Sequence, residues 1–297
     1  MKPAFDVIVV IPVGPNSSVD FIIDTVDSYH HYTKRPYKVV FADDSQQGIG
    51  KELKARLPDC DVITTKKAMG GWAGLYITLC LAFRHAVENY QFKAVLKLDT
   101  DALIIGNNPE EEVLSLFSDQ PDAGIAGQYP NDYFGNPWNI NWPKQRIING
   151  TRRWKFFRRP FANWQLRKLY NRALQNGYKT GESILGGAYF MSEPYLAQLY
   201  TESLLPNYTL QTVNLGEDHL FSLLAKATGF TLESLSGNEE PFGCAWKGLP
   251  VSPEQLIRDN KKIIHSVRYW ETMKEAGIRA YFKKMREESA VVINSVL

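Results

Sequence analysis

Short apolar runs alternate with helix-forming segments through the first third of the chain. Four such runs lie at residues 6–13, 38–42, 61–65 and 93–98. Strands that alternate with helices of this length form βαβ units, and such units build a parallel sheet. The sequence therefore predicts a fold of the α/β class, with a mostly parallel sheet flanked by helices.

The later part of the chain carries further signals of the same kind. We expect strands at 184–191 and 262–267 and a helix at 215–227. Asn108, followed by Pro109 and three glutamates, predicts a helix start, and so does the capping box that opens at Ser252. The chain ends in a charged amphipathic helix. Because no repeat or linker interrupts it, we expect one domain over residues 1–297.

The composition excludes several classes of protein. Hydrophobic residues make up 44% and charged residues 22% of the chain, which is ordinary for a globular protein. Cys60, Cys80 and Cys244 are too few and too far apart for a disulfide framework or a zinc site. No stretch reaches the ~18 apolar residues that a membrane-spanning helix needs. These features favour a reducing compartment, and we expect the cytoplasm.

Residues 131–182, which we call the basic aromatic segment, differ from the rest of the chain. Between residues 133 and 181 there is no Asp or Glu, but there are eleven Lys or Arg residues. Four of the seven tryptophans also lie here: Trp138, Trp142, Trp154 and Trp164. Tryptophan faces stack on sugar rings, and Arg and Lys bind phosphates and other anions.

Three interpretations of this segment are open. It can bind an acceptor substrate, which we rank first, or it can be an insertion packed by its aromatics with solvated cations. Alternatively, residues 144–179 can place the protein on the cytoplasmic face of an anionic membrane. We expect no nucleic acid partner, because no recognised nucleic-acid-binding motif accompanies the positive charge.

Acidic residues follow two of the predicted strands. Asp43-Asp44 ends the second strand, and Asp99-Thr100-Asp101 ends the fourth. Ligands of an open parallel sheet bind beyond the carboxyl ends of its strands. Two carboxylates one residue apart repel each other unless they share a cation, and Mg²⁺ and Mn²⁺ prefer oxygen ligands. Taken alone, however, such acids are more often plain solvent-exposed residues at strand ends.

In their order along the chain, these and later motifs resemble those of the GT-A glycosyltransferases. The matching stretches are 9–13 (first strand), 41–45 (acidic contact to uridine and ribose), 68–74 (glycine-containing turn), 99–101 (DxD motif), 186–188 (small-residue strand on the acceptor side), 216–218 (acidic motif of the catalytic base) and 263–266 (late histidine). Two departures from the family pattern concern the contacts to the nucleobase of the donor. No glycine separates Asp44 from Ser45, and the usual Asn is missing from 68–74. No single motif is specific, but the ordered set is.

The resemblance implies a Rossmann-like GT-A fold and a metal-dependent transfer of sugar from a nucleotide diphosphate donor, with uridine diphosphate the expected carrier. It implies that Asp99, Asp101 and His265 hold Mn²⁺ or Mg²⁺, which neutralises charge on the departing diphosphate. The donor contacts implied by it are Pro12, Gly14, Asp43, Asp44, Gly70, Gly71, Asp99, Thr100 and Arg268.

On the acceptor side, the resemblance implies that Asp218 is the catalytic base and that Glu217 binds the acceptor. A carboxylate at a helix start stays ionised and can take the proton of an acceptor hydroxyl. With Asp218 as base, the reaction inverts the anomeric centre. The acceptor would be a carbohydrate, a lipid-linked sugar or another hydroxyl compound. Residues 1–128 would form the nucleotide-binding half, and 129–297 the acceptor-binding half with the insertion and the C-terminal helix.

Two rival classes share some of these features. Phosphatases of the haloacid dehalogenase type also carry Asp-x-Asp at a strand end, but they need it on the first strand, whereas here it lies mid-chain and precedes Ala102. A non-catalytic nucleotide-sugar or glycan-binding protein on the same fold is the alternative to an enzyme. The intact set of Asp99, Asp101, Asp218 and His265 favours the enzyme.

Overall fold

The β-branched run at the start of the chain forms β1 (Val7–Val13), the centre of the parallel part of a seven-stranded sheet. The structure is a computed structural model that describes residues 1–152, 160–213, 215–237 and 240–296. β1 lies between β2 (Tyr37–Asp43) and β4 (Ala94–Leu98) and is parallel to both, and β3 (Asp61–Thr64) follows beyond β2. The carboxyl ends of all four strands therefore meet at one edge.

Beyond β4 the direction of the strands changes. β7 (Ala188–Ser192) is antiparallel to both β4 and β6 (Ala123–Gly127), and β8 (Thr231–Ser234) is parallel to β6. The strand order is β3-β2-β1-β4-β7-β6-β8. The predicted class, α/β with a mostly parallel, Rossmann-like sheet flanked by helices, is confirmed.

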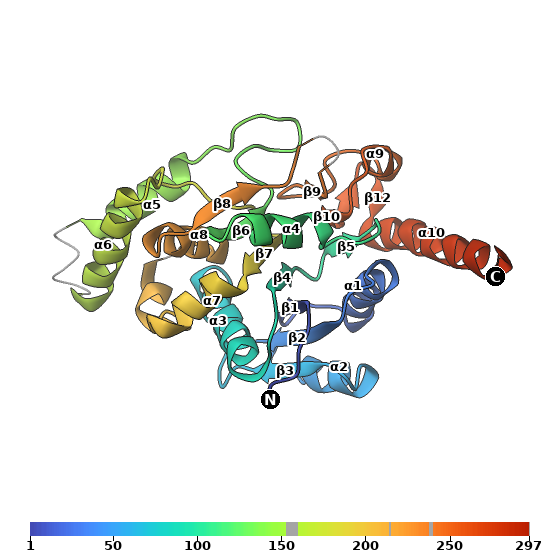
Figure 1. Cartoon of the computed structure of the whole chain (residues 1–297), viewed down its shortest axis with the longest axis horizontal. Coiled ribbons are helices and arrows are strands. Elements are labelled where there is room, and N and C mark those ends of the chain that lie inside the picture. The colour runs from blue at the N-terminus through green and yellow to red at the C-terminus, as the bar shows by residue number, and fades with distance from the viewer. Residues whose placement is uncertain (153–159, 214, 238–239, 297) are drawn as a thin grey trace.

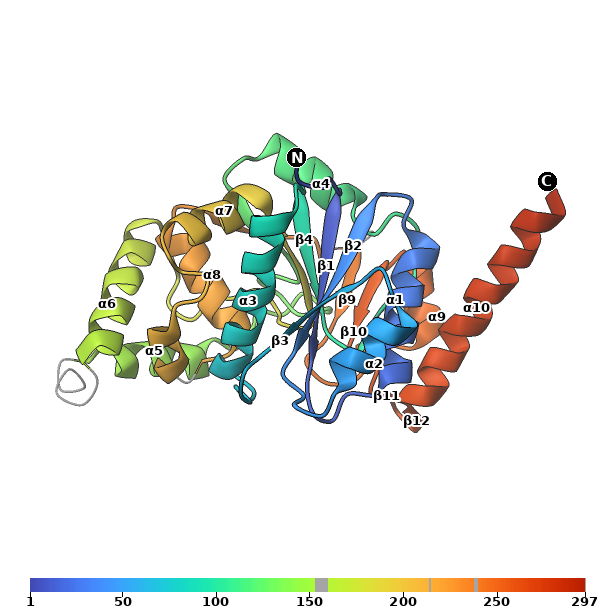
Figure 2. The ribbon, with the colours of Figure 1, turned by 90° about the horizontal axis from the view of Figure 1, so that it is seen from below.

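Helices cover both faces of this sheet (Figure 2). Successive side chains of a strand point to opposite faces, so that Ile8 and Val10 pack in one core and Val7 and Val9 in the other. The first core lies under α3 (Ala73–Asn89), α6 (Pro160–Gln175), α7 (Glu193–Thr201) and α8 (Glu217–Ala227). The second lies under α1 (Val19–Tyr32), α2 (Ile49–Arg56) and α4 (Glu111–Asp119).

A second, three-stranded sheet continues directly from β4. Its strand β5 (Ala102–Ile104) is antiparallel to β10 (Ile263–His265), which is parallel to β9 (Phe242–Cys244). The turn at residues 99–101 therefore joins the two sheets. Helix α9 (Pro253–Arg258) starts as predicted, since the Ser252 hydroxyl accepts a hydrogen bond from the backbone N–H of Gln255.

The remaining elements lie towards the two ends of the molecule (Figure 1). The basic aromatic segment contains α5 (Asn141–Thr151) and α6 at one end, and α10 (Glu275–Val296) projects at the other. Short elements complete the chain: η2 (Tyr208–Val213), β11 (Tyr269–Trp270) and β12 (Met273–Lys274). No helix within the described ranges is long and apolar enough to cross a membrane.

Two sequence-based boundaries were wrong. Helix α4 begins at Glu111, because Asn108 adopts a left-handed φ of 50° in a turn and cannot cap a helix there. Glu110 is buried in this turn and accepts a hydrogen bond from the Thr33 hydroxyl at 2.8 Å. β7 begins only at Ala188, since residues 184–187 form part of the wall of a cleft instead.

A buried arginine on α10 ties the C-terminal helix to the turn between the two sheets. Arg279 is 4% exposed, and its Nη1 lies 2.9 Å from Asp24 Oδ2 on α1. Its Nη2 donates to the Thr100 carbonyl at 2.6 Å. A buried guanidinium is stable only with such partners, and this one holds the middle residue of the turn.

We predict that Arg279→Met lowers the free energy of unfolding by about 3 kcal/mol, since it leaves buried polar partners unpaired. This is the low end of the range of about 3 to 5 kcal/mol for breaking a buried ion pair, because Arg286 still pairs with Asp24 in the variant. Urea denaturation measures the change. Lys284→Met is the matched control, because its ion pair with Glu288 on the same helix is exposed and contributes less than about 0.5 kcal/mol. Equal stabilities of the two variants would contradict the assignment.

Candidate functional site

The turn after β4 is held from both sides by backbone hydrogen bonds. The Asp99 N–H donates to the Gly187 carbonyl at 2.9 Å, and the Asp99 carbonyl accepts from the Ala102 N–H at 3.0 Å. The Asp101 carbonyl accepts from the Val267 N–H at 2.8 Å. These bonds fix both carboxylates of the Asp-x-Asp motif at the carboxyl edge of the parallel strands.

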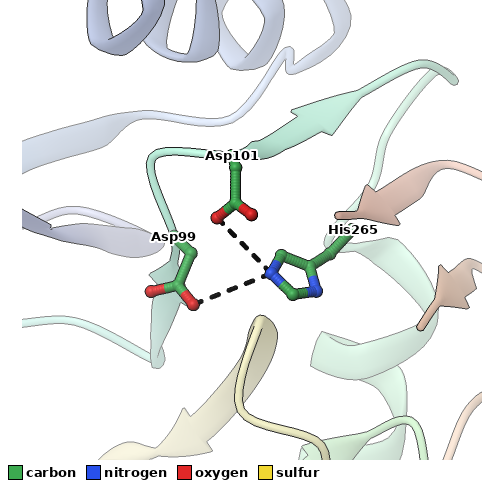
Figure 3. Close-up of side chains that lie close together, drawn as sticks. All are labelled: Asp99, Asp101 and His265. Atoms are coloured by element: carbon green, nitrogen blue, oxygen red, sulfur yellow. Dashed lines mark ion pairs between the residues drawn. The ribbon is translucent and has the colours of Figure 1, made fainter. Parts of the chain in front are cut away.

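His265 reaches the same turn from the neighbouring strand β10, where it pairs with Ala102 (Figure 3). Its Nε2 lies 3.4 Å from Asp101 Oδ1 and 3.9 Å from Asp99 Oδ2. Its Nδ1 lies 2.9 Å from the Ala245 carbonyl, which can only accept a hydrogen bond, so Nδ1 carries the proton. With a metal ion bound, Nε2 would be the ligand atom while the Nδ1 hydrogen bond orients the ring, the arrangement of a metal-binding histidine.

The three ligand atoms could hold one divalent cation. They all lie within 4.8 Å of one another, and ligands about 2.1 Å from one ion lie roughly 3 to 4 Å apart. Two carboxylates and one imidazole suit Mn²⁺ and, through the oxygens, Mg²⁺. Gly187 is needed beside them, because a Cβ there would lie 2.1 Å from His265 Nδ1.

Positive partners hold Asp101 ionised. Burial alone would raise the pKa of Asp101, but hydrogen bonding and charge from His265, together with Ser266 and Arg268, hold that pKa well below its usual value. The Ser266 hydroxyl donates to Oδ2 at 2.7 Å, and Arg268 Nε lies 2.8 Å from the same oxygen. The Arg268 side chain is 67% exposed, so this ion pair can be exchanged for another anion at little cost.

Lys97 links this cluster to a second pair of acids, and the sequence analysis missed it. Its side chain is fully buried, and its Nζ lies 2.7 Å from Asp99 Oδ1 and 3.3 Å from Glu217 Oε1. It also donates to the Gly186 carbonyl. Burial would lower the pKa of Lys97, but Asp99 and Glu217 outweigh burial and raise it. A lysine inside an otherwise apolar strand, two residues before an acidic motif, was the available signal.

The second acid pair lies at the N-terminus of α8. Burial, together with Asp218 and Asp99, raises the pKa of Glu217 to about 7, although Lys97 opposes this. Asp218 is half-buried, and its Oδ1 accepts from the His219 N–H at 2.8 Å. Gly186 leaves room beside both, since a Cβ there would lie 3.0 Å from Glu217 and 3.2 Å from Asp218.

The candidate metal cluster (Asp99, Asp101 and His265) and the acid pair (Glu217 and Asp218) line one cleft of about 750 Å³. Of the residues that the sequence singled out, the cleft is lined by Asp99, Asp101, Gly186, Gly187, Glu217, Asp218, His265 and Arg268. From the basic aromatic segment, Trp138, Trp142 and Arg146 also contribute. Trp154, Arg153, Arg158 and Arg159 lie outside the described residues. Trp72 and Trp246, which the sequence analysis did not single out, line the cleft as well.

The other expected donor contacts lie apart from the lining of this cleft: Pro12, Gly14, Asp43, Asp44, Gly70, Gly71 and Thr100. Asp44 accepts hydrogen bonds from the backbone N–H groups of Met69 and Gly70 at 2.9 Å, so its carboxylate holds the turn before α3. Asp43 is buried and accepts from the Ser45 N–H at 2.9 Å. Their contacts to a nucleotide stay predictions.

Comparison with solved structures gives a structural neighbour, whereas two other comparisons found no match. No protein-family model and no curated protein matches the chain. Among solved structures, it is similar to the apo structure of WbbM, a bifunctional glycosyltransferase, with a TM-score of 0.46 and 10% identity over 94% of this chain and 49% of that chain. This chain thus spans about half the length of WbbM. The resemblance to GT-A enzymes is matched by two features of the structure itself, the Rossmann-like sheet and the Asp99–Asp101–His265 cluster.

We predict that His265→Ala weakens Mn²⁺ binding by more than about 10-fold, because loss of a direct ligand costs at least as much as loss of a residue that only orients a ligand. Electron paramagnetic resonance of free Mn²⁺ in a titration gives the affinity. His30→Ala, an exposed histidine on α1, is the control and keeps wild-type affinity. Unchanged binding in His265→Ala would remove the histidine from the ligand set.

Proposed function

We propose that the protein is a metal-dependent glycosyltransferase that moves a sugar from a nucleotide diphosphate donor to an acceptor hydroxyl. The observation that carries the proposal is the meeting of the Asp99–Asp101–His265 cluster with the Glu217–Asp218 pair in one cleft. A metal-dependent transfer with inversion uses a cation at the leaving diphosphate and a base at the acceptor, both near one carbon. The cluster offers a place for the cation, and the acid pair in the same cleft offers a base.

On the donor side, a bound Mn²⁺ or Mg²⁺ would act as a Lewis acid that neutralises charge on the leaving diphosphate. Asp99, Asp101 and His265 would hold it. Arg268 is the further donor contact that we propose, because its exposed guanidinium can turn from Asp101 to a phosphate oxygen. Uridine diphosphate is the carrier that the sequence resemblance favours.

On the acceptor side, Asp218 is the base that we propose. Its Oδ2 accepts no hydrogen bond from any described residue, and Asp218 lines the cleft, so this oxygen is open to an acceptor hydroxyl. It would take the hydroxyl proton as the acceptor oxygen bonds to the anomeric carbon, while the bond to the diphosphate breaks with its electron pair. Attack opposite the leaving group inverts that carbon. Glu217, which lines the cleft beside Asp218, would bind the acceptor.

The proposal extends to the substrates and to the division of the domain. We propose a nucleotide-sugar donor and a carbohydrate, lipid-linked or other hydroxyl acceptor, with 1–128 as the nucleotide-binding half and 129–297 as the acceptor-binding half of one domain. The cytoplasmic location and the contact of residues 144–179 with an anionic membrane stay predictions. The second candidate, a non-catalytic nucleotide-sugar or glycan-binding protein, would share the cleft but not the proton transfer at Asp218.

Donor binding is tested by thermal unfolding with uridine and guanosine diphosphates, each with and without Mn²⁺. A ligand at 100 times its Kd stabilises by about 2.7 kcal/mol, so a Tm rise of a few degrees is expected only when metal is present. Asp101→Ala should abolish the rise, and Asp59→Ala, an exposed acid, should keep it. A rise that is independent of metal, or that survives in Asp101→Ala, would contradict the proposal.

Transfer is tested with Asp218→Asn. This variant should keep the metal-dependent Tm rise and lose about 10²- to 10⁴-fold in turnover, because the base is gone while the donor site is intact. Release of uridine diphosphate from a panel of its sugars, with simple glycosides as acceptors, measures turnover. Turnover at the wild-type rate would remove Asp218 as the base. Donor binding without turnover in the wild type would favour the non-catalytic alternative.

A further inference from the structure

Three tryptophans from separate parts of the chain line the cleft with much of their side chains exposed. Trp72, just before α3, is 57% exposed, Trp142 on α5 is 40% exposed, and Trp246 after β9 is 70% exposed. Exposed aromatic surface gathered at one cleft marks a place where a ligand excludes water. These side chains surround the metal cluster and the acid pair rather than a distant surface.

Trp72 and Trp142 form one aromatic wall. Their ring centroids are 5.3 Å apart, and their planes are inclined by 46°. Trp72 has φ 56° and ψ −122°, a backbone conformation that a bulky residue rarely adopts. Such strain is retained where the position of the side chain is required for function. Here the strained residue carries the ring that meets Trp142 at the cleft.

The same cleft contains buried polar atoms without partners. Trp138 Nε1 and His219 Nδ1 form no hydrogen bond within the part of the chain that the structure describes. The His219 ring lies 6.1 Å from that of Trp142 and belongs to the residue after Asp218. Unpaired buried polar atoms cost free energy that a ligand hydroxyl can recover. Aromatic faces beside unpaired polar atoms match a pyranose ring, which has apolar C–H faces and a polar rim.

Arg146 adds a positive charge to this wall. It lies one helical turn after Trp142 on α5, and its guanidinium carbon is 5.3 Å from the centre of the Trp142 ring. It is exposed and forms no ion pair with any residue of the described ranges. Arg268, the other arginine that lines the cleft, pairs with Asp101 and is the donor contact proposed above. Arg146 is therefore available to an anion on a ring stacked beside it.

We propose that Trp72 and Trp142 form the acceptor subsite and that it takes a pyranose bearing a carboxylate or a phosphate, which Arg146 binds. Its role as the acceptor side rests on the proposed function, whereas its binding of a charged sugar does not. Trp142 and Arg146, four residues apart on α5, each recognise one part of this ligand. The ring of Trp142 stacks on the sugar, and the guanidinium of Arg146 binds its charged group.

Binding is tested without nucleotide or metal, so that a failure of the donor site leaves the result unaffected. Saturation-transfer difference NMR gives affinities for methyl α-glucopyranoside, for the methyl glycoside of glucuronic acid and for glucose 1-phosphate. We expect at least one charged sugar to bind about fivefold to tenfold more tightly than the neutral glycoside. The tighter of the two identifies the charged group as carboxylate or phosphate.

Variants separate the two parts of the subsite. Trp142→Ala should weaken all three sugars by about fivefold to tenfold, because the stacking surface is lost. Arg146→Gln should abolish the preference for the charged sugar and leave the neutral one unchanged. The matched controls are Trp164→Ala and Lys168→Gln, an i,i+4 pair on α6 with Nζ 5.5 Å from the ring centre, which does not line the cleft and should change nothing.

Three results would overturn the inference: no saturation transfer at millimolar sugar, equal affinity for neutral and charged sugars, or a preference that survives Arg146→Gln. Wild-type Tm values for the surface variants show that each is folded. Charged-sugar binding in a protein that binds no nucleotide would contradict the proposed function but support this site. Nucleotide binding without sugar binding would support the proposed donor site but contradict this sugar site.

Discussion

A single buried ammonium group connects the two halves of the cleft. Lys97 lies in the middle of the sheet, where an unpaired charge would cost several kcal/mol. Its partners come from three places in the chain: Asp99 after β4, the Gly186 carbonyl before β7, and Glu217 at the start of α8. Because Lys97 contacts both Asp99 and Glu217, it holds the metal cluster beside the acid pair.

The two oxygens of the Asp99 carboxylate have different partners. Asp99 turns Oδ1 to Lys97 and Oδ2 towards His265, so a single oxygen is left for a metal ion. Asp101 likewise turns Oδ2 to Ser266 and Arg268 and Oδ1 to His265. Each ligand is thus oriented by a partner outside the cluster. Preorganised ligands of this kind bind a cation without first having to rearrange.

Local sequence patterns predicted the features of the fold that depend on residues close together in the chain. The apolar strand runs, the cap at Ser252 and the acids at the carboxyl edge depend on neighbours in the chain. The antiparallel direction of β7 could not be read in this way, since it depends on pairing with strands far away in sequence. Asn108 showed the limit of a local rule, because the turn that buries Glu110 overrides its preference for a cap.

The site residues that belong to ordered sequence motifs were predicted. Single residues whose partners are distant in sequence were not. The cluster of Asp99, Asp101 and His265 was named from the sequence, and the structure brings these residues together. Lys97 was read as part of an apolar strand, because nothing in its own segment shows that two carboxylates face it. Trp72 was predicted only as part of the glycine-containing turn at 68–74, because its partner on α5 lies 70 positions away in the chain.

Anomalous diffraction from crystals grown with Mn²⁺ and uridine diphosphate shows whether this cluster holds a divalent cation that binds a nucleotide's diphosphate. We expect one strong manganese peak bonded to Asp99 Oδ2, Asp101 Oδ1 and His265 Nε2, with diphosphate oxygens completing its coordination. A manganese–nucleotide complex elsewhere on the protein, with Asp101 still paired to Arg268 and the cluster empty, would contradict it.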